Sequence, residues 1–140
     1  ETASVRCGVR AACAETKGFV VALGDQPSIR GQVVQSIISA FRSRGEDTPT
    51  IVVPTHNGQR GHPLLFSGHF REAVLRDFDD VGLRGLLAAN LHAIEQIPIA
   101  ESGILRDMDD PKQYANELKA RDAACEAAKT SNAGRLPKCE

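Results

Sequence analysis

The chain has 140 residues, of which 41% are hydrophobic and 25% are charged, and its formal net charge is -1. This composition is typical of one soluble globular domain and excludes a disordered chain, a collagen-like repeat and a coiled coil. Because 17 basic residues balance 18 acidic ones, we expect no broad basic surface for nucleic acid. No apolar stretch approaches the roughly 20 residues of a membrane-spanning helix, so we expect no membrane partner.

Hydrophobic periodicity predicts a helix and then a strand–helix–strand unit in the first part of the chain. Apolar residues at helical spacing predict an amphipathic helix over residues 2–16, which Gly18 ends. The run Phe19–Leu23 predicts a strand buried on both faces, as in parallel sheets. A helix over about residues 30–44 and a strand at Ile51–Val53 follow. This order predicts a βαβ unit with a right-handed crossover in an open α/β sheet.

Shorter elements are expected in the second part of the chain. In order, they are a loop at Thr55–His62, a strand at Leu64–Phe66, helices at Phe70–Phe78 and Leu83–Leu91, a strand at Ala93–Ile99 and the start of another at Ile104. Asp110-Pro111-Lys112-Gln113 then has the pattern of a capped helix start, for a helix from Pro111 to about Lys129. We expect a partial domain over residues 1–120, and a helix end and frayed tail over 121–140.

The cysteines and the first residues favour a cytoplasmic protein. Cys7, Cys13, Cys125 and Cys139 form no CxxC pair, and the first two are six residues apart, on different faces of a helix. This spacing favours buried or incidental thiols over a disulfide framework or a structural zinc site. Residues 1–4 do not resemble a signal peptide. The chain begins without Met inside a predicted helix, so we expect that it is incomplete at its front.

Asp25 is the first candidate functional residue. It follows the first predicted strand, in a loop between Gly24 and Pro27. Ligands of open α/β sheets bind at the carboxyl ends of the strands, where a carboxylate can hold a divalent cation against a phosphate. The alternative is a turn-forming aspartate beside glycine and proline, which is common.

Asp107 and Asp109 form a second acidic candidate site. They are two residues apart, so in an extended strand both side chains point to one face. Two neighbouring carboxylates repel each other unless a cation or a proton neutralises one of them, and this arrangement suits a nucleotide–metal site. The alternative is a solvated acidic turn in which Asp110 alone has a role, as a helix cap.

The segment Gln59-Arg60-Gly61-His62-Pro63 is a third candidate. Gly61 permits a close approach of the backbone to a ligand, Pro63 stiffens the exit, Arg60 can bind a phosphate, and His62 can donate a hydrogen bond. The spacing of the histidines matches no usual zinc pattern, and His69 and His92 are interpreted as surface or helix-edge residues; the four are His56, His62, His69 and His92.

A fourth candidate is the helix start around Gly82 and Arg84, which can receive an anion. The alternative is that the acidic loop before it caps an ordinary helix. The chain contains no GxGxxG, GxxxxGK[ST] or GxSxG motif. These absences weigh against a Rossmann dehydrogenase, a P-loop NTPase and an α/β-hydrolase.

Taken in order, five segments resemble the molybdenum cofactor nucleotidyltransferases, specifically the cytidylyltransferase branch of the MobA-like family. They are VVALGDQP at 20–27, IVVP at 51–54, GHPLLF at 61–66, GLRGLL at 82–87 and GILRDMDDP at 103–111. The resemblance covers about residues 3–118. It implies a three-layer, Rossmann-like α/β nucleotidyltransferase domain with a mostly parallel sheet.

The resemblance implies an enzyme that transfers CMP from CTP to molybdopterin, releases pyrophosphate and uses Mg²⁺ as cofactor. A molybdenum hydroxylase is the implied recipient of the product. Asp25 and Asp109 would be the catalytic acids, and Asp107 would join them in binding the magnesium ion. Gln26, in the loop of sequence DQP, and Ser4 would bind the nucleotide.

The resemblance places substrate binding at Gly61, His62 and Pro63, which form the GHP loop on the pterin side, and at Arg84 near the substrate phosphate. The glycine-rich loop that opens these enzymes, of the type L-A-x-G-x-S-x-R-x-G followed by a lysine, has no match here. An N-terminal truncation is therefore implied, and we expect little CTP-dependent turnover from the isolated chain. The alternatives are a non-catalytic pterin-binding or chaperone-like protein, and a nucleotidyltransferase for another small phosphate.

Overall fold

A computed structural model describes residues 2–77, 81–105, 112, 114–116, 118–119 and 121–123 of the chain. The chain divides into two compact units, Glu1–Arg106 and Asp107–Glu140. In the second unit the described residues are all helical, and they fall inside the helix expected from Pro111 to about Lys129. The helix start expected at Asp110, Pro111 and Gln113 lies outside the described residues.

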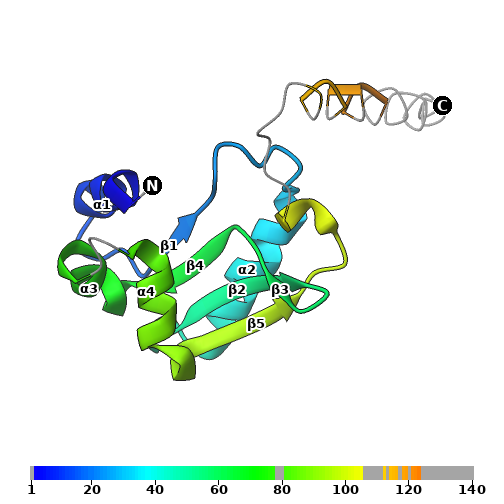
Figure 1. Ribbon diagram of the computed structural model, residues 1–140. Helices are drawn as coiled ribbons and strands as arrows, with labels where there is room; N and C mark the ends of the chain where they lie inside the picture. Colours follow the sequence, from blue (N-terminus) through cyan, green and yellow to red (C-terminus); the bar gives the residue numbers. More distant parts are fainter. Residues whose placement is uncertain are drawn as a thin grey trace, which may run out of the picture. The chain divides into compact units, whose positions relative to one another are not determined.

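Five strands form one mixed sheet in the first unit (Figure 1). They are β1 (Gly18–Val21), β2 (Ile51–His56), β3 (Gln59–Arg60), β4 (Leu64–Ser67) and β5 (Ile94–Pro98). β4 lies between β1 and β2 and runs antiparallel to both, so that Phe66 stands opposite Phe19 on one side and Ile51 on the other. β5 pairs in parallel with the other edge of β2, and β3 forms a hairpin with the end of β2.

The α/β fold class is confirmed, but the expectation of a mostly parallel sheet is wrong. Of the four pairings between described strands, only that of β2 with β5 is parallel. The connection from β2 to β4 is too short for the crossover of roughly a dozen residues that a parallel neighbour needs. β1, β2 and β5 still run in one direction, because β4 is antiparallel to β1 and β2. The carboxyl ends of these three strands therefore lie together, and we call this end of the sheet the carboxyl end.

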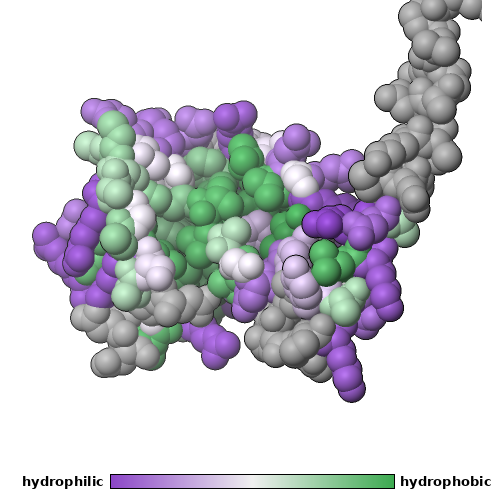
Figure 2. Space-filling model, turned by 90° about the horizontal axis from the view of Figure 1, so that it is seen from above, coloured by the Kyte–Doolittle hydropathy of each residue, from purple (hydrophilic) through white to green (hydrophobic). Residues whose placement is uncertain are grey.

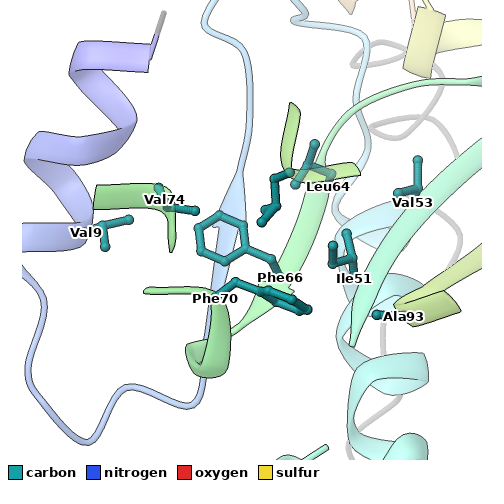
Figure 3. Packing of buried hydrophobic residues seen from close by; sticks show 9 residues of the cluster. Val9, Ile51, Val53, Leu64, Phe66, Phe70, Val74 and Ala93 are labelled. Atoms are coloured by element: carbon teal, nitrogen blue, oxygen red, sulfur yellow. The ribbon is translucent and has the colours of Figure 1, made fainter. Parts of the chain in front are cut away.

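Helices cover both faces of the sheet and make three layers (Figure 1). On one face lie α1 (Thr2–Ala11), α3 (Arg71–Arg76) and α4 (Gly82–Ala89). Figure 3 shows Val9 of α1 and Val74 of α3 beside Phe66 of β4 in this first cluster of buried side chains. Phe66 also stacks on Phe19 of β1, with ring centroids 5.2 Å apart.

α2 (Gly31–Arg44) covers the opposite face and confirms the helix expected over about residues 30–44. Its buried side chains pack against strand residues that alternate with those of the first cluster, because successive side chains of a strand point to opposite faces. A 3-10 turn, η3 (Ser102–Leu105), completes this side. The second cluster consists of Val33, Ile37, Phe41, Val52, Leu65 and Ile104. The predicted three-layer architecture is confirmed.

The prediction that the first strand is buried on both faces is wrong. Within the described residues β1 pairs with β4 alone, and Val20 is 41% exposed. Phe19 and Val21 pack against the first cluster, so one buried face accounts for the apolar sequence of β1. Figure 2 shows the molecule from above, where hydrophobic side chains gather in the middle of the face and hydrophilic ones surround them.

Two local predictions in the second part of the chain are also wrong. The expected loop at Thr55–His62 contains the end of β2 and all of β3. Asn57 and Gly58 have positive φ angles of 51° and 79°, as a two-residue hairpin turn of type I′ requires, and Asn-Gly is the usual sequence for it. Ile104 lies in η3 rather than in a strand.

The remaining elements are confirmed in type: the helices are shorter than expected, whereas β2 runs on to His56 and β4 to Ser67, beyond the ends expected for these strands. α1 ends at Ala11 rather than at residue 16, and β5 lies inside the range expected for its strand. Two further 3-10 turns, η1 (Gly68–Phe70) and η2 (Leu91–Ala93), precede α3 and β5. Among the described residues, no helix has both the length and the apolar character that crossing a bilayer demands.

Candidate functional site at the carboxyl end of the sheet

The β1–α2 loop, residues 22–30, brings Asp25 and Gln26 to the carboxyl end of the sheet. Two backbone hydrogen bonds shape this loop: the amide of Gln26 donates to the carbonyl of Leu23, and the amide of Ile29 donates to the carbonyl of Gln26, both at 3.4 Å. Gln26 is buried, at 6% exposure, whereas Asp25 is exposed. Asp25 forms no ion pair with a described residue. The loop therefore places the exposed carboxylate of Asp25, which has no ion pair among the described residues, next to the buried residue Gln26.

The GHP loop, Gly61-His62-Pro63, is fixed by main-chain contacts. The amide of Gly61 donates to the carbonyl of Pro54 at 2.9 Å, and the amide of His62 donates to the carbonyl of Ile104 at 3.1 Å. A Cβ at Gly61 would collide with the carbonyl group of Ile104, whose carbon would lie 2.9 Å away. Only glycine allows this approach. Gly61 and Pro63 are buried and His62 is half-buried.

η3 connects these two loops, although they are far apart in the sequence. It follows β5 at the carboxyl end of the sheet and is drawn in yellow in Figure 1. A Cβ at Gly103 would lie 3.0 Å from the carbonyl oxygen of Ser28, so the backbone of η3 abuts the loop that carries Asp25. The carbonyl of Ile104 meanwhile accepts the hydrogen bond from His62. One turn of chain thus contacts both loops.

Further polar contacts attach the segment between β5 and η3. The amide of Ile99 donates to the carbonyl of Thr55 at 2.7 Å, and the Nδ1 atom of His56 lies 2.9 Å from the carbonyl oxygen of Ile99. Arg30 forms an ion pair of 3.5 Å with Glu101. From the sequence, His56 was considered only as a zinc ligand, and Arg30 and Glu101 were not singled out, because these contacts join residues far apart in the chain.

The predicted site residues fall into three groups. Asp25, Gln26 and the GHP loop lie on loops that meet at η3. Ser4 and Arg84 are exposed on α1 and α4, which pack on the sheet face opposite to η3, and their roles stay predictions. Asp107 and Asp109 lie outside the described residues. Among those described, no group of three His, Cys, Asp or Glu side chains could hold a metal ion.

The clearest pKa displacements among the described groups lie at the other end of the sheet. Lys17 directly precedes β1, and its Nζ donates a hydrogen bond to Asp47 at 2.8 Å. This contact lowers the pKa of Asp47 and raises the pKa of Lys17. A hydrogen bond from the Cys13 thiol lowers the pKa of Glu15 in the same region. Cys7 and Cys13 are both free and exposed.

Comparison with known proteins identifies the family. The profile of the MobA-like NTP transferase domain matches residues 1–95. The chain belongs to this family. The matched part of this MobA-like domain contains the β1–α2 loop, the GHP loop and Arg84, whereas η3, Asp107 and Asp109 lie beyond it. A search of curated proteins finds no match.

Solved mycobacterial structures share the fold of this MobA-like domain. The Rv0371c homolog from Mycobacterium sp. strain JC1 is 25% identical, with a TM-score of 0.68 over 86% of the chain and 57% of the homolog. Rv0371c from Mycobacterium tuberculosis H37Rv is 24% identical, with a TM-score of 0.69 over 85% of the chain and 60% of Rv0371c. Rv0371c in complex with manganese gives a TM-score of 0.67 at 24% identity, over 83% of the chain and 59% of that protein. The chain thus spans less than two thirds of these proteins.

Proposed function

We propose that this MobA-like domain belongs to a nucleotidyltransferase that transfers CMP from CTP to molybdopterin and releases pyrophosphate. The family supports nucleotidyl transfer in general. The observation that carries the proposal is the meeting of the Asp25 loop and the GHP loop at η3, because a transfer reaction needs its donor and acceptor sites side by side. The resemblance of both loops to the cytidylyltransferase branch supplies the substrates.

The donor side is assigned to Asp25 and Gln26. An exposed carboxylate with no ion pair among the described residues suits a hard divalent cation, which prefers oxygen ligands. We assign Asp25 to a magnesium ion, which would neutralise the charge that develops on the phosphates. For Asp107 and Asp109 the proposed role as further ligands rests on the family resemblance alone. The manganese complex of Rv0371c supports a divalent ion in this fold. The buried amide of Gln26 can donate and accept hydrogen bonds, as base recognition requires.

The acceptor side is assigned to the GHP loop. Its backbone is bonded to Pro54 and Ile104, so the half-buried His62 is attached to a fixed piece of main chain. A rigid support of this kind positions an acceptor phosphate for in-line attack at low entropic cost. Ser4 is assigned to nucleotide binding, and Arg84 to binding of the substrate phosphate. A cytoplasmic molybdenum hydroxylase would receive the product. No side-chain nucleophile takes part.

Metal binding tests the role of Asp25 in the 140-residue chain itself. We expect Asp25→Asn to weaken Mn²⁺ binding at least about tenfold, because the substitution removes a charged ligand. Isothermal titration or the electron paramagnetic resonance signal of free Mn²⁺ measures the affinity. Asp77→Asn is the matched control, since Asp77 is an exposed aspartate at the end of α3. Equal losses in the two variants would contradict the assignment.

Nucleotide preference tests the proposed substrates in the natural gene product. We expect kcat/KM for CTP with molybdopterin to exceed that for GTP, and Gln26→Leu to reduce this ratio about tenfold, because a lost buried hydrogen bond penalises the preferred base. Mn²⁺ affinity should change less than the ratio does. Equal use of CTP and GTP overturns the cytidylyl assignment, and pterin binding without pyrophosphate release supports a non-catalytic pterin carrier instead. Transfer to another small phosphate likewise overturns the choice of molybdopterin.

A further inference from the structure

His56 is the last residue of β2 and makes a contact that the proposed reaction does not use. Along β2 it shares a face with Val52, which belongs to the cluster of α2 and η3. Its Nδ1 atom lies 2.9 Å from the carbonyl oxygen of Ile99. A carbonyl oxygen only accepts, so Nδ1 carries the proton and donates. This bond therefore selects the Nδ1-protonated tautomer of a half-buried ring.

The bond of His56 holds the first residue of the segment Ile99–Leu105. The other polar attachments of this segment are mainly backbone contacts, namely Ile99 to Thr55, Ile104 to His62, and Gly103 against Ser28. Its apolar side chains, Ile99, Ile104 and Leu105, pack with the second cluster. Side-chain substitution leaves such backbone hydrogen bonds in place. The ion pair of Arg30 with Glu101 is long, at 3.5 Å, and the Arg30 side chain is 72% exposed, so it contributes little. His56 is thus the better-anchored of these two side-chain links to the segment.

We propose that His56 is a positioning residue, whose Nδ1–H bond to Ile99 holds the segment Ile99–Leu105 against the GHP loop and the Asp25 loop. The chain of contacts runs from His56 through Ile99 to Ile104, and from Ile104 to the amide of His62. Loss of the first contact loosens the start of the segment, while Ile104 stays packed in the second cluster, and the bond from the His62 amide to Ile104 then opens more often. The identity of what the two loops bind rests on the proposed function, whereas the claim that His56 holds the segment Ile99–Leu105 does not.

Substitutions at His56 separate the hydrogen bond from simple packing. His56→Asn keeps a donor, because the amide nitrogen of Asn stands at about the same distance along the side chain as Nδ1. His56→Phe keeps a planar ring and has no donor. His92→Phe is the control, because His92 is an exposed histidine in η2.

The direct readout is hydrogen exchange of the His62 amide in the 140-residue chain, followed by NMR. We expect His56→Phe to speed this exchange between about two- and tenfold, as the loss of one net hydrogen bond predicts, and His56→Asn to restore most of the protection. His92→Phe should change nothing. Unchanged exchange in His56→Phe, or equal acceleration in the Asn and Phe variants, would overturn the proposal. The ¹⁵N shifts of the His56 ring should show the Nδ1–H tautomer, and the Nε2–H tautomer would also overturn it.

Mn²⁺ titration of the same variants tests whether the hydrogen bond of His56 also affects the proposed metal site. If the ion binds at the Asp25 loop, we expect His56→Phe to weaken it about twofold or more and His56→Asn to bind as the unchanged chain does. A chain that binds no Mn²⁺ contradicts the proposed metal site but leaves the exchange result to decide on His56. If His56→Phe accelerates the exchange of the His62 amide but leaves Mn²⁺ affinity unchanged, then His56 does not act on the loop that carries Asp25.

Discussion

The two ends of the sheet use charged side chains differently. At the amino end, before the start of the parallel strands, Lys17 pairs with Asp47 and Arg44 pairs with Glu95, each at 2.8 Å. At the carboxyl end the ion pair between Arg30 and Glu101 is longer, at 3.5 Å. Asp25 there has no ion pair among the described residues.

This difference separates structural polar groups from groups available to a ligand. At the amino end the backbone is also closed on itself, since the amide of Gly68 donates to Lys17 and the amide of Ser67 donates to Thr50. At the carboxyl end the backbone hydrogen bonds hold the loops in place. The side chains of Asp25 and His62 are then left to contact a ligand. Binding sites in open α/β sheets form at this end for the same reason.

The largest effect is expected where the carboxyl end is packed most closely. In Gly61→Ala the new Cβ meets the backbone of Ile104, which cannot move like a flexible side chain. We expect a loss of about 3 kcal/mol in the free energy of unfolding, as for overpacked sites, measured by urea denaturation. Gly24→Ala is the matched control in the other loop, because a Cβ there meets nothing within 4 Å. If the two variants were equally stable, the close packing at η3 would be refuted.

A smaller effect is expected from Arg71, which stabilises the amino end. Its guanidinium donates to the carbonyls of Ala12 and Cys13, at 2.7 and 2.8 Å, and lies over the ring of Phe19. We expect Arg71→Met to cost about 1.5 kcal/mol, the range of a charged hydrogen bond in a partly buried place. Thermal and urea unfolding measure this loss. Mn²⁺ affinity should stay unchanged, and a parallel loss of Mn²⁺ binding would show that the two ends are coupled.

The sequence predicted the helices and the candidate loops better than the strand pairing. α2 was predicted almost to its ends because Val33, Ile37 and Phe41 repeat at helical spacing on a single buried face. The antiparallel position of β4 was missed because an apolar run such as Leu64–Phe66 has the same composition in either direction. The Asn57-Gly58 turn carried the missing information, since it predicts a hairpin and therefore a reversal of the chain.

The candidate site shows the same division. Asp25 and the GHP loop were predicted from local sequence, because each belongs to a short motif beside glycine or proline, whereas Gln26 was predicted from the family resemblance. The bond between His56 and Ile99 was not predictable, because it joins residues that are 43 positions apart in the sequence. The role of Gly61 was predicted as close approach to a ligand, whereas the structure shows close approach to the backbone of Ile104.

The smallest effect is expected from the exposed ion pair of Lys17 with Asp47. Because Lys17 lowers the pKa of Asp47 below its ordinary value of 3.8 in the folded chain, the pair stabilises the fold at pH values above 3.8 and this contribution is lost as the pH falls through the lowered pKa. Urea midpoints of the unchanged chain and of Lys17→Met should therefore differ slightly at pH 7 and converge at acidic pH. Asp47→Asn should behave like Lys17→Met, while Asp77→Asn serves as the control, since Asp77 has no ion pair with the residues that the structure describes. High salt should shrink the difference at pH 7, because both side chains are exposed to screening ions. A difference that persists in acid would mean that Lys17 stabilises the amino end through its aliphatic stem rather than through its charge.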